Sequence, residues 1–292
     1  DRREFNMLIQ FEHVNLGQEN GKFSPRPLAD GELADVMSAW QETLGERGWN
    51  ALYLENHDQP RAVSRFGDPH GAWYESATAL ATAYFLQRGT PFIYQGQEIG
   101  MLGGHFTRPS DFRDVESLNY LSAHPGEGVP AGLAAISRDN GRTPMQWDSS
   151  PAAGFTSGTP WIDLPPSASS IHVERQLADA SSVLAFYRAL IDARHRVPAL
   201  TSGSFRRVDA GDPGLFVYVR SCEGSEVLVM TNLSGRAITP RGAVLDEELH
   251  PSGWRLYLGN VDASPIDPSE ADAGDPLPAS TMAPWEARVY LR

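Results

Sequence analysis

The sequence predicts an α/β domain with a parallel sheet, followed by a smaller all-β antiparallel sandwich domain. In the first two thirds, apolar runs of strand length alternate with segments whose apolar residues recur at helical spacing, which is typical of βαβ units. From about Thr201 onward, short β segments separated by turn residues replace this alternation. We place the boundary near Pro198–Gly203 and expect domains at residues 1–198 and 199–292.

Periodicity assigns the elements of the first domain in chain order. The apolar run Phe5–Phe11 predicts a buried strand. Gly45 and Gly89 indicate the ends of two helices. A long segment at about 100–180 is rich in Gly, Pro, Ser and Asp and reads as a functional loop. The expected strands are Phe5–Phe11, Ala51–Leu54 and Thr90–Tyr94, and the expected helical faces run over Leu33–Leu44, Tyr74–Phe85 and Val183–Ile191, the last capped by Ser181-Ser182.

In the second domain, alternating and β-branched residues predict five strands of similar length. Turn residues separate them, as an antiparallel arrangement requires. The expected strands are Ser204–Val208, Leu215–Arg220, Val227–Leu233, Trp254–Leu258 and Ala287–Leu291.

Composition excludes several classes of protein. With 24 Lys+Arg against 37 Asp+Glu, the net charge of −13 argues against nucleic acid or an anionic membrane surface as a partner. A hydrophobic fraction of 41% excludes a disordered chain, and no apolar run is long enough to span a membrane. The single cysteine, Cys222, excludes a disulfide framework and a cysteine-based zinc site.

The chain opens without Met and leads at once into an apolar strand, so we expect further sequence upstream. The lack of a targeting signal is therefore uninformative, and our expected location is the cytoplasm.

Polar residues follow each of the three predicted parallel strands. They are Glu12-His13 after the first strand, Glu55–Arg61 after the second, and Tyr94–Glu98 after the third. Sites in parallel α/β folds form at the carboxyl ends of the strands. Buried carboxylates and imidazoles also need partners there. This pattern fits either a structural hydrogen-bond network or a functional site.

The second cluster resembles the motif that ends the seventh strand in the α-amylase superfamily of retaining glycoside hydrolases. More narrowly, the chain is similar to the oligo-1,6-glucosidase and α-glucosidase branch, and the resemblance covers nearly the whole chain in the family's order. Gln97 departs from the family pattern, because many members carry Glu at that position. The segments that carry the resemblance are Glu55–Arg61, Ser64–Asp68, Gly89–Met101, Phe112–Asn119, Ser137–Asp148, Ala153–Phe155 and Thr159–Trp161.

This resemblance implies that the chain is the C-terminal part of a (β/α)8 TIM barrel, about strands 6–8, with a C-terminal β domain. The family's nucleophile Asp and acid/base Glu follow strands four and five, so a missing N-terminal barrel segment is implied. The isolated chain is then expected to be inactive. A family calcium site would also lie upstream, so we expect no metal here, and we expect no cofactor.

The resemblance also implies the roles of the site residues. Asp58 would bond the 2- and 3-hydroxyls of the −1 sugar and stabilise the oxocarbenium-like transition state, and His57 would donate to the same sugar. The alternative is a His-Asp pair held for packing. Arg142 resembles the arginine that contacts the terminal glucose; alternatively it pairs with a structural carboxylate such as Asp139 or Asp148.

Two further residues are candidates for substrate binding. Glu12 borders the +1 subsite in the family, and Arg61 faces either that subsite or a barrel carboxylate. Trp147 and Trp161 could stack on sugar, although large aromatic residues more often serve packing.

The leading hypothesis is a retaining α-glucosidase that hydrolyses terminal α-glucosidic bonds of short oligosaccharides. Sucrose isomerase, trehalose-phosphate hydrolase and a transglycosylating relative are close alternatives, because the residue beside the nucleophile lies upstream. From another class, the chain could be a non-catalytic sugar-binding or partner-subunit homologue. The presence of His57, Asp58 and Arg142 together argues against that class.

Overall fold

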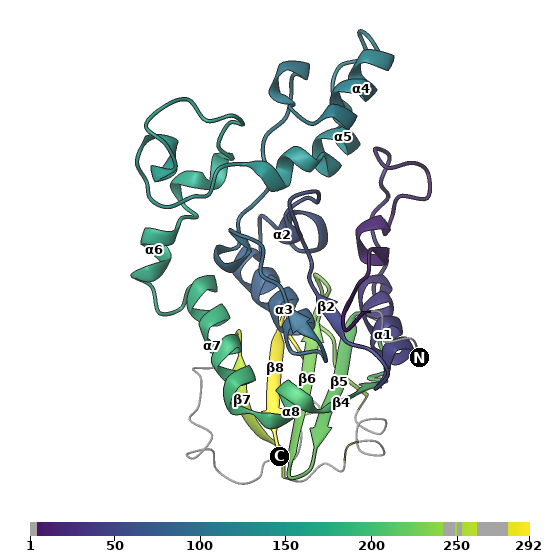
Figure 1. Ribbon diagram of the computed structural model, residues 1–292. Helices are drawn as coiled ribbons and strands as arrows, with labels where there is room; N and C mark the ends of the chain where they lie inside the picture. Colours follow the sequence, from purple (N-terminus) through teal and green to yellow (C-terminus); the bar gives the residue numbers. More distant parts are fainter. Residues whose placement is uncertain (1–4, 242–248, 250–252, 262–279) are drawn as a thin grey trace.

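The computed structural model describes residues 5–241, 249, 253–261 and 280–292. These residues form two sheets, a three-stranded parallel sheet in the order β1-β2-β3 and a five-stranded antiparallel sheet in the order β4-β5-β6-β8-β7. Figure 1 shows helices α3 and α7 between the upper part of the chain and the five-stranded sheet. The expected combination of a partial barrel and an antiparallel β domain is therefore present.

Each connection between the parallel strands contains helix, as the alternating pattern predicts. Gly45 ends the first helix with a φ of +45°, a conformation that favours glycine. Ser182 caps the helix that begins at Val183 by accepting a hydrogen bond from the Ala185 amide at 3.2 Å. The elements are β1 (Leu8–Ile9), α1 (Glu32–Leu44), β2 (Asn50–Leu52), α2 (Ala62–Phe66), α3 (Trp73–Phe85), β3 (Thr90–Pro91), α7 (Val183–Arg196) and α8 (Pro198–Ser202).

The prediction of a buried strand at Phe5–Phe11 is wrong for this chain. The strand β1 covers only Leu8–Ile9, and Phe5, Ile9 and Phe11 are 80%, 58% and 54% exposed. By contrast, all three residues of β2 are buried, because β2 is the central strand and α1 and α3 contribute to the core beside it. An apolar sequence signals that a strand can be buried, but its partners decide whether it is.

The segment between residues 100 and 180 is more helical than its composition predicts. Its helices are short, so each offers too few turns for a clear periodicity. Phe106, Phe112, Leu133 and Ile162 form a separate buried cluster within it, and α4 and α5 lie at the end of the molecule farthest from the five-stranded sheet (Figure 1). The helices of this segment are α4 (Val115–Ala123), α5 (Ala131–Ile136) and α6 (Val173–Leu177), with 3-10 turns at Pro109–Asp111, Arg138–Arg142, Pro151–Gly154 and Pro166–Ser169. Two further 3-10 turns lie outside it, at Glu12–Asn15 and Gln97–Ile99.

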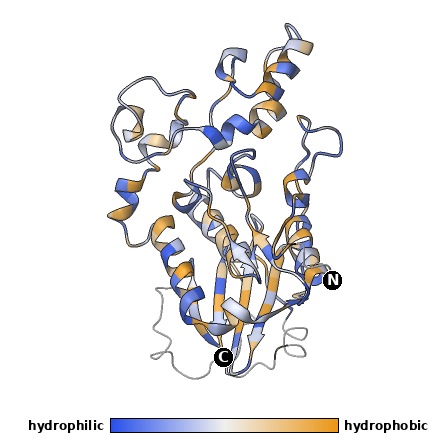
Figure 2. Ribbon diagram, in the orientation of Figure 1, coloured by the Kyte–Doolittle hydropathy of each residue, from blue (hydrophilic) through white to orange (hydrophobic). Residues whose placement is uncertain are grey.

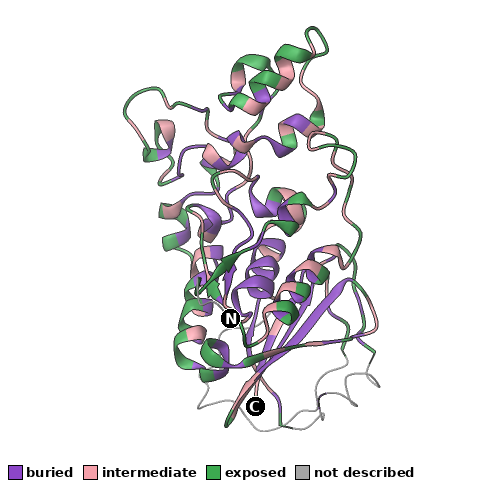
Figure 3. Cartoon of the chain, turned by 45° about the vertical axis from the view of Figure 1, so that its right-hand side comes forward, coloured by how far each residue is buried: buried purple, intermediate pink, exposed green. Residues whose placement is uncertain are grey.

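The antiparallel sheet contains the five strands that the sequence predicts, with ends that differ by a few residues. Apolar residues line its strands (Figure 2), and the buried residues run through the sheet and helix α3 (Figure 3). An isolated bridge joins Ile238 to Met282, and both side chains belong to the cluster on the face away from the helices. The strands are β4 (Ser204–Val208), β5 (Leu215–Cys222), β6 (Ser225–Asn232), β7 (Arg255–Gly259) and β8 (Ala287–Leu291).

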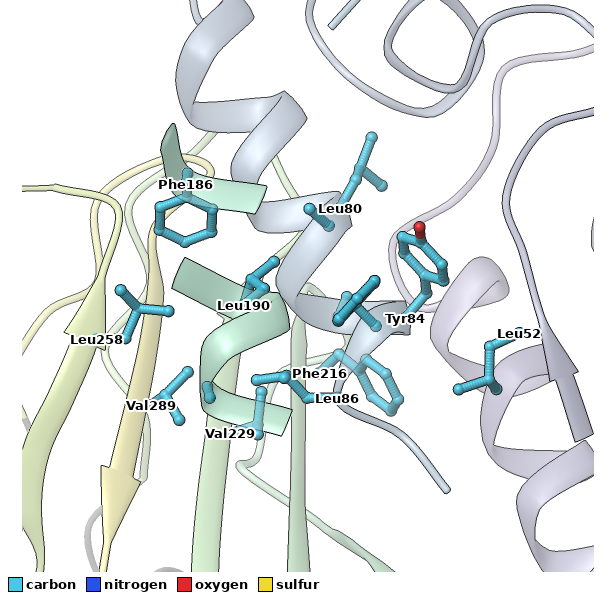
Figure 4. Close-up of a cluster of buried hydrophobic side chains, with 14 of the residues drawn as sticks. Leu52, Leu80, Tyr84, Leu86, Phe186, Leu190, Phe216, Val229, Leu258 and Val289 are labelled. Carbon is cyan, nitrogen blue, oxygen red and sulfur yellow. The ribbon is translucent and has the colours of Figure 1, made fainter. Parts of the chain in front are cut away.

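The main hydrophobic core joins the two parts of the chain. One continuous cluster contains residues of β2, α1, α3 and α7 together with residues of the antiparallel sheet. In Figure 4, side chains from the helices meet side chains from the strands: Leu80, Tyr84, Phe186 and Leu190 on one side, and Phe216, Val229, Leu258 and Val289 on the other. None of the helices in the described part of the chain combines the length and the apolar character that a membrane-spanning segment needs.

Arg220 of β5 is a buried polar connection within this core. Its guanidinium is fully buried and donates to the carbonyl oxygens of Leu86, Gly203 and Ser204 at 2.7–2.9 Å. Burial lowers the pKa of Arg220 to about 9, so the side chain remains charged at neutral pH. Arg220 therefore ties the end of α3 to the start of the β domain.

We expect Arg220→Met to reduce the free energy of unfolding of the full-length protein by roughly 2–4 kcal/mol, because three carbonyls, two of them on buried residues, lose a charged donor. The matched control is Arg207→Met on β4. Arg207 forms an ion pair with Asp35 at 2.6 Å at a partly exposed position, where the loss should stay below about 1 kcal/mol. Urea denaturation measures the free energy of unfolding of both variants. Equal losses in Arg220→Met and Arg207→Met would contradict the role of Arg220 as a buried connection.

Candidate active site

A polar turn follows β2 and presents His57 and Asp58. The Asn56 side-chain oxygen accepts a hydrogen bond from the Asp58 amide at 2.8 Å, and the Asn56 carbonyl accepts one from the Gln59 amide at 3.1 Å. Such local bonds are typical of Asn in tight turns. The side chain of His57 is 72% exposed and that of Asp58 is 42% exposed, with His57 Nε2 lying 3.3 Å from Asp58 Oδ2. Both side chains are therefore partly exposed, and neither is packed into the core that the described residues form.

A buried ion pair lies beneath this turn. Arg61 Nη1 is 3.0 Å from Glu55 Oε1 and donates to the Gln95 carbonyl at 2.7 Å. The other Glu55 oxygen accepts the Ala62 amide at the start of α2. Burial raises the pKa of Glu55, and the Arg61 charge opposes that rise.

The hypothesis that Arg61 binds substrate is therefore replaced. Its side chain is only 1% exposed, and its guanidinium also lies 5.2 Å from the centre of the Tyr94 ring. The sequence left two alternatives open, the +1 subsite and a barrel carboxylate. In the structure Arg61 faces a carboxylate, that of Glu55. The sequence shows only that Arg61 follows the His-Asp pair. The direction in which the Arg61 side chain points depends on the backbone between Asp58 and Arg61.

Arg142 reaches the turn from the 100–180 segment. Its Nη2 donates to Asp58 Oδ1 at 2.7 Å, and its Nε donates to the His57 carbonyl at 3.0 Å. The two structural partners considered for it are engaged elsewhere, since Asp139 accepts the amides of Arg113 and Asp114, and Asp148 bonds to Ser150. The structure thus brings His57, Asp58 and Arg142 together.

Further charged side chains that the sequence analysis did not single out extend this group. Arg138 Nη2 lies 2.7 Å from Asp114 Oδ1, and Arg138 Nη1 lies 3.9 Å from Asp58 Oδ1. Arg138 Nε is 3.8 Å from Glu116, which also forms an ion pair with Lys22. Both acids belong to the Phe112–Asn119 segment that carried the family resemblance, but no local spacing connects them to Asp58.

Glu12 and His13 follow β1 and differ sharply in exposure. Glu12 is exposed and accepts a hydrogen bond from Trp40 Nε1 at 2.9 Å. His13 is fully buried against Tyr53, with ring centres 4.7 Å apart, and burial lowers its pKa to about 4. A neutral, buried His13 is a structural residue. The proposed role of Glu12 at a +1 subsite stays a prediction.

The third strand end forms a bracing network. Tyr94 donates its hydroxyl to the Gly141 carbonyl at 2.8 Å, and Glu98 accepts the Gly96 amide at 2.8 Å. Gln97 donates to the hydroxyls of Tyr84 and Tyr187 at 3.0 Å. An amide can donate where the carboxylate of many family members cannot, and it remains neutral in this buried place.

The arrangement offers hydrogen-bonding groups for a hydroxyl-rich ligand. Asp58 supplies acceptor oxygens, and His57 and Arg142 supply donors beside them. Within the part of the chain that the structure describes, no group of three or more His, Cys, Asp or Glu residues could hold a metal ion.

Residues 1–203 match the family described as "Alpha amylase, catalytic domain". The chain belongs to this family. It is 41% identical to the oligo-1,6-glucosidase of Halalkalibacterium halodurans over all of its length, which covers 51% of that relative. The chain thus spans about half the length of the curated relatives it matches.

Solved structures of family members share the fold. The trehalose-6-phosphate hydrolase of Bacillus licheniformis superposes with a TM-score of 0.85 at 34% identity, over 99% of this chain and 52% of that one. The trehalulose synthase MutB of Pseudomonas mesoacidophila MX-45 superposes with a TM-score of 0.82 at 34% identity, over 100% of this chain and 52% of that one. These likenesses confirm the fold that the resemblance implied.

We expect Arg61→Met to reduce the free energy of unfolding of the full-length protein by about 3–5 kcal/mol at neutral pH, because Glu55 is left buried and unpaired. Burial raises the folded-state pKa of Glu55. The folded state then takes up a proton more readily than the unfolded state, so the penalty should shrink as the pH falls.

The control for Arg61→Met is the double variant Glu55→Gln with Arg61→Met, which removes both charges and should recover part of the lost stability. Thermal unfolding of the single and double variants between neutral and mildly acidic pH measures these differences. A penalty for Arg61→Met that is independent of pH and of Glu55 would refute the ion-pair interpretation.

Proposed function

We propose that the full-length protein containing this chain is a retaining α-glucosidase of the oligo-1,6-glucosidase type. It would hydrolyse terminal α-glucosidic bonds of short oligosaccharides. The observation that carries the proposal is the convergence of His57, Asp58 and Arg142 at the carboxyl end of β2. The similarity to oligo-1,6-glucosidases over the whole chain supports it.

In the proposed mechanism, Asp58 accepts hydrogen bonds from hydroxyls of the terminal glucose and stabilises the positive charge that develops on the ring. His57 and Arg142 donate to the same sugar. A retaining mechanism also needs a nucleophile and an acid about 5–5.5 Å apart. We propose that both come from an N-terminal barrel segment that pairs with the edges β1 and β3 and covers the exposed Phe5, Ile9 and Phe11.

The assay that tests this function uses the full-length protein with isomaltose, trehalose 6-phosphate and sucrose as separate substrates. Release of α-glucose from isomaltose, followed by NMR of the first-formed anomer, would support a retaining glucosidase. Turnover of trehalose 6-phosphate alone, or conversion of sucrose to isomers, would instead support the activity named for one of the similar structures. No turnover of any of them would favour the non-catalytic alternative.

We expect Asp58→Asn to reduce kcat by at least about 10³-fold, the scale for losing a group that stabilises charge in the transition state. The replacement is isosteric, so the melting temperature should change little. Asp68→Asn is a matched control, because Asp68 accepts local amides of His70 and Gly71 in an exposed turn. If Asp58→Asn keeps more than about a tenth of wild-type turnover, Asp58 does not have the catalytic role.

A further inference from the structure

A chain of alternating charges runs from Asp58 into the 100–180 segment. In this chain of charges, each carboxylate lies next to at least one arginine or lysine, and each arginine or lysine lies next to at least one carboxylate. Such alternation lowers the cost of gathering charge at a partly buried place. The members, in spatial order, are Asp58, Arg142, Asp114, Arg138, Glu116 and Lys22.

Asp114 is the buried member of this chain, with a side chain only 2% exposed. One of its oxygens, Oδ2, caps helix α4 by accepting from the amide and hydroxyl of Ser117, both at 3.1 Å. The other oxygen, Oδ1, faces Arg138 at 2.7 Å and Arg142 at 3.6 Å. Burial alone would raise the pKa of Asp114, but the Ser117 hydrogen bonds and the Arg138 charge outweigh it and lower the pKa.

Arg138 lies among three carboxylates, and Asp114 is much nearer to it than the other two. It is 2.7 Å from Asp114 but 3.9 Å from Asp58, on the same Asp58 oxygen that Arg142 already bonds at 2.7 Å. Because attraction weakens with distance, Asp114 holds Arg138 more strongly than Asp58 does. Without the Asp114 charge, the remaining carboxylates near Arg138 would be Glu116 at 3.8 Å, which already pairs with Lys22, and Asp58 at 3.9 Å.

We propose that Asp114 is a positioning residue that keeps Arg138 away from Asp58. Asp58 then bonds one arginine and keeps acceptor capacity for sugar hydroxyls. A second guanidinium on Asp58 would compete with the substrate, since arginine binds carboxylates through two donors. The inference rests on the proposed function, because it assigns Asp58 the task of binding sugar.

The simpler explanation is that Asp114 only caps α4, and two variants separate the two roles. Asp114→Asn keeps a side-chain oxygen that can cap the helix but removes the charge that holds Arg138. Ser117→Ala removes a partner of the capping oxygen and of the Ser137 hydroxyl, and it removes no contact of either arginine. Arg138→Gln removes the competing guanidinium, and Lys22 still pairs with Glu116 in that variant.

The test measures kcat and KM on isomaltose for full-length wild type, Asp114→Asn, Arg138→Gln, Ser117→Ala and the double variant Asp114→Asn with Arg138→Gln. We expect Asp114→Asn to lower kcat by about 10- to 100-fold, the scale for a displaced catalytic group. Its KM should change less, because Asp58 acts mainly in the transition state. The double variant should regain most of the lost kcat, and Ser117→Ala should lower the melting temperature but not kcat.

A double variant no more active than Asp114→Asn would overturn the proposal, as would a kcat loss in Ser117→Ala equal to that in Asp114→Asn. A crystal structure of Asp114→Asn gives a readout that needs no activity. We expect an Arg138 nitrogen in direct contact with Asp58, and an unmoved Arg138 would also overturn the proposal. If wild type turns over no α-glucoside, the proposed function fails. The crystal structure of Asp114→Asn still decides in that case whether Asp114 holds Arg138.

Discussion

The buried ion pair between Glu55 and Arg61 is the interaction on which the site depends. One Glu55 oxygen meets Arg61 and the other accepts the Ala62 amide, so the two ends of the intervening turn converge on a single carboxylate. Arg61 also bonds the carbonyl of Gln95, which joins this turn to the segment after β3. Asp58 can remain exposed and still be well placed, because the residues on either side of it are held from below.

The second half of the site comes from the 100–180 segment, and several contacts hold it in place. Arg142 bonds both the Asp58 carboxylate and the His57 carbonyl, which fixes it to the turn. Phe23 packs edge-on against Tyr120 with ring centres 5.1 Å apart, and Lys22 pairs with Glu116 beside it. The segment that connects β1 to α1 therefore supports α4 from the side, and the charges around Asp58 are held by packing as well as by attraction.

The antiparallel β domain contributes to the site indirectly. Its strands share one core with α3 and α7, and Arg220 bonds the carbonyl of Leu86 at the end of α3. Helix α3 follows the turn that carries Asp58, and Tyr84 on it bonds Gln97 beside the third strand end. A β domain that buries these helices thus limits how far the strand ends can move.

The sequence by itself determined the elements and the order of the motifs. The helices α1, α3 and α7 and the five antiparallel strands follow from periodicity and turn residues, which are local properties of the chain. The motif at Glu55–Arg61 likewise predicted Asp58 and His57 as candidate site residues. Tertiary structure alone decided the partners: Arg142 meets Asp58 across 84 positions, whereas Arg61, three positions from Asp58, turns away to Glu55. It also decided that Asp114 and Arg138 adjoin the candidate site. Spacing along the chain says nothing about which distant carboxylate a guanidinium reaches, because that choice depends on how separate segments pack.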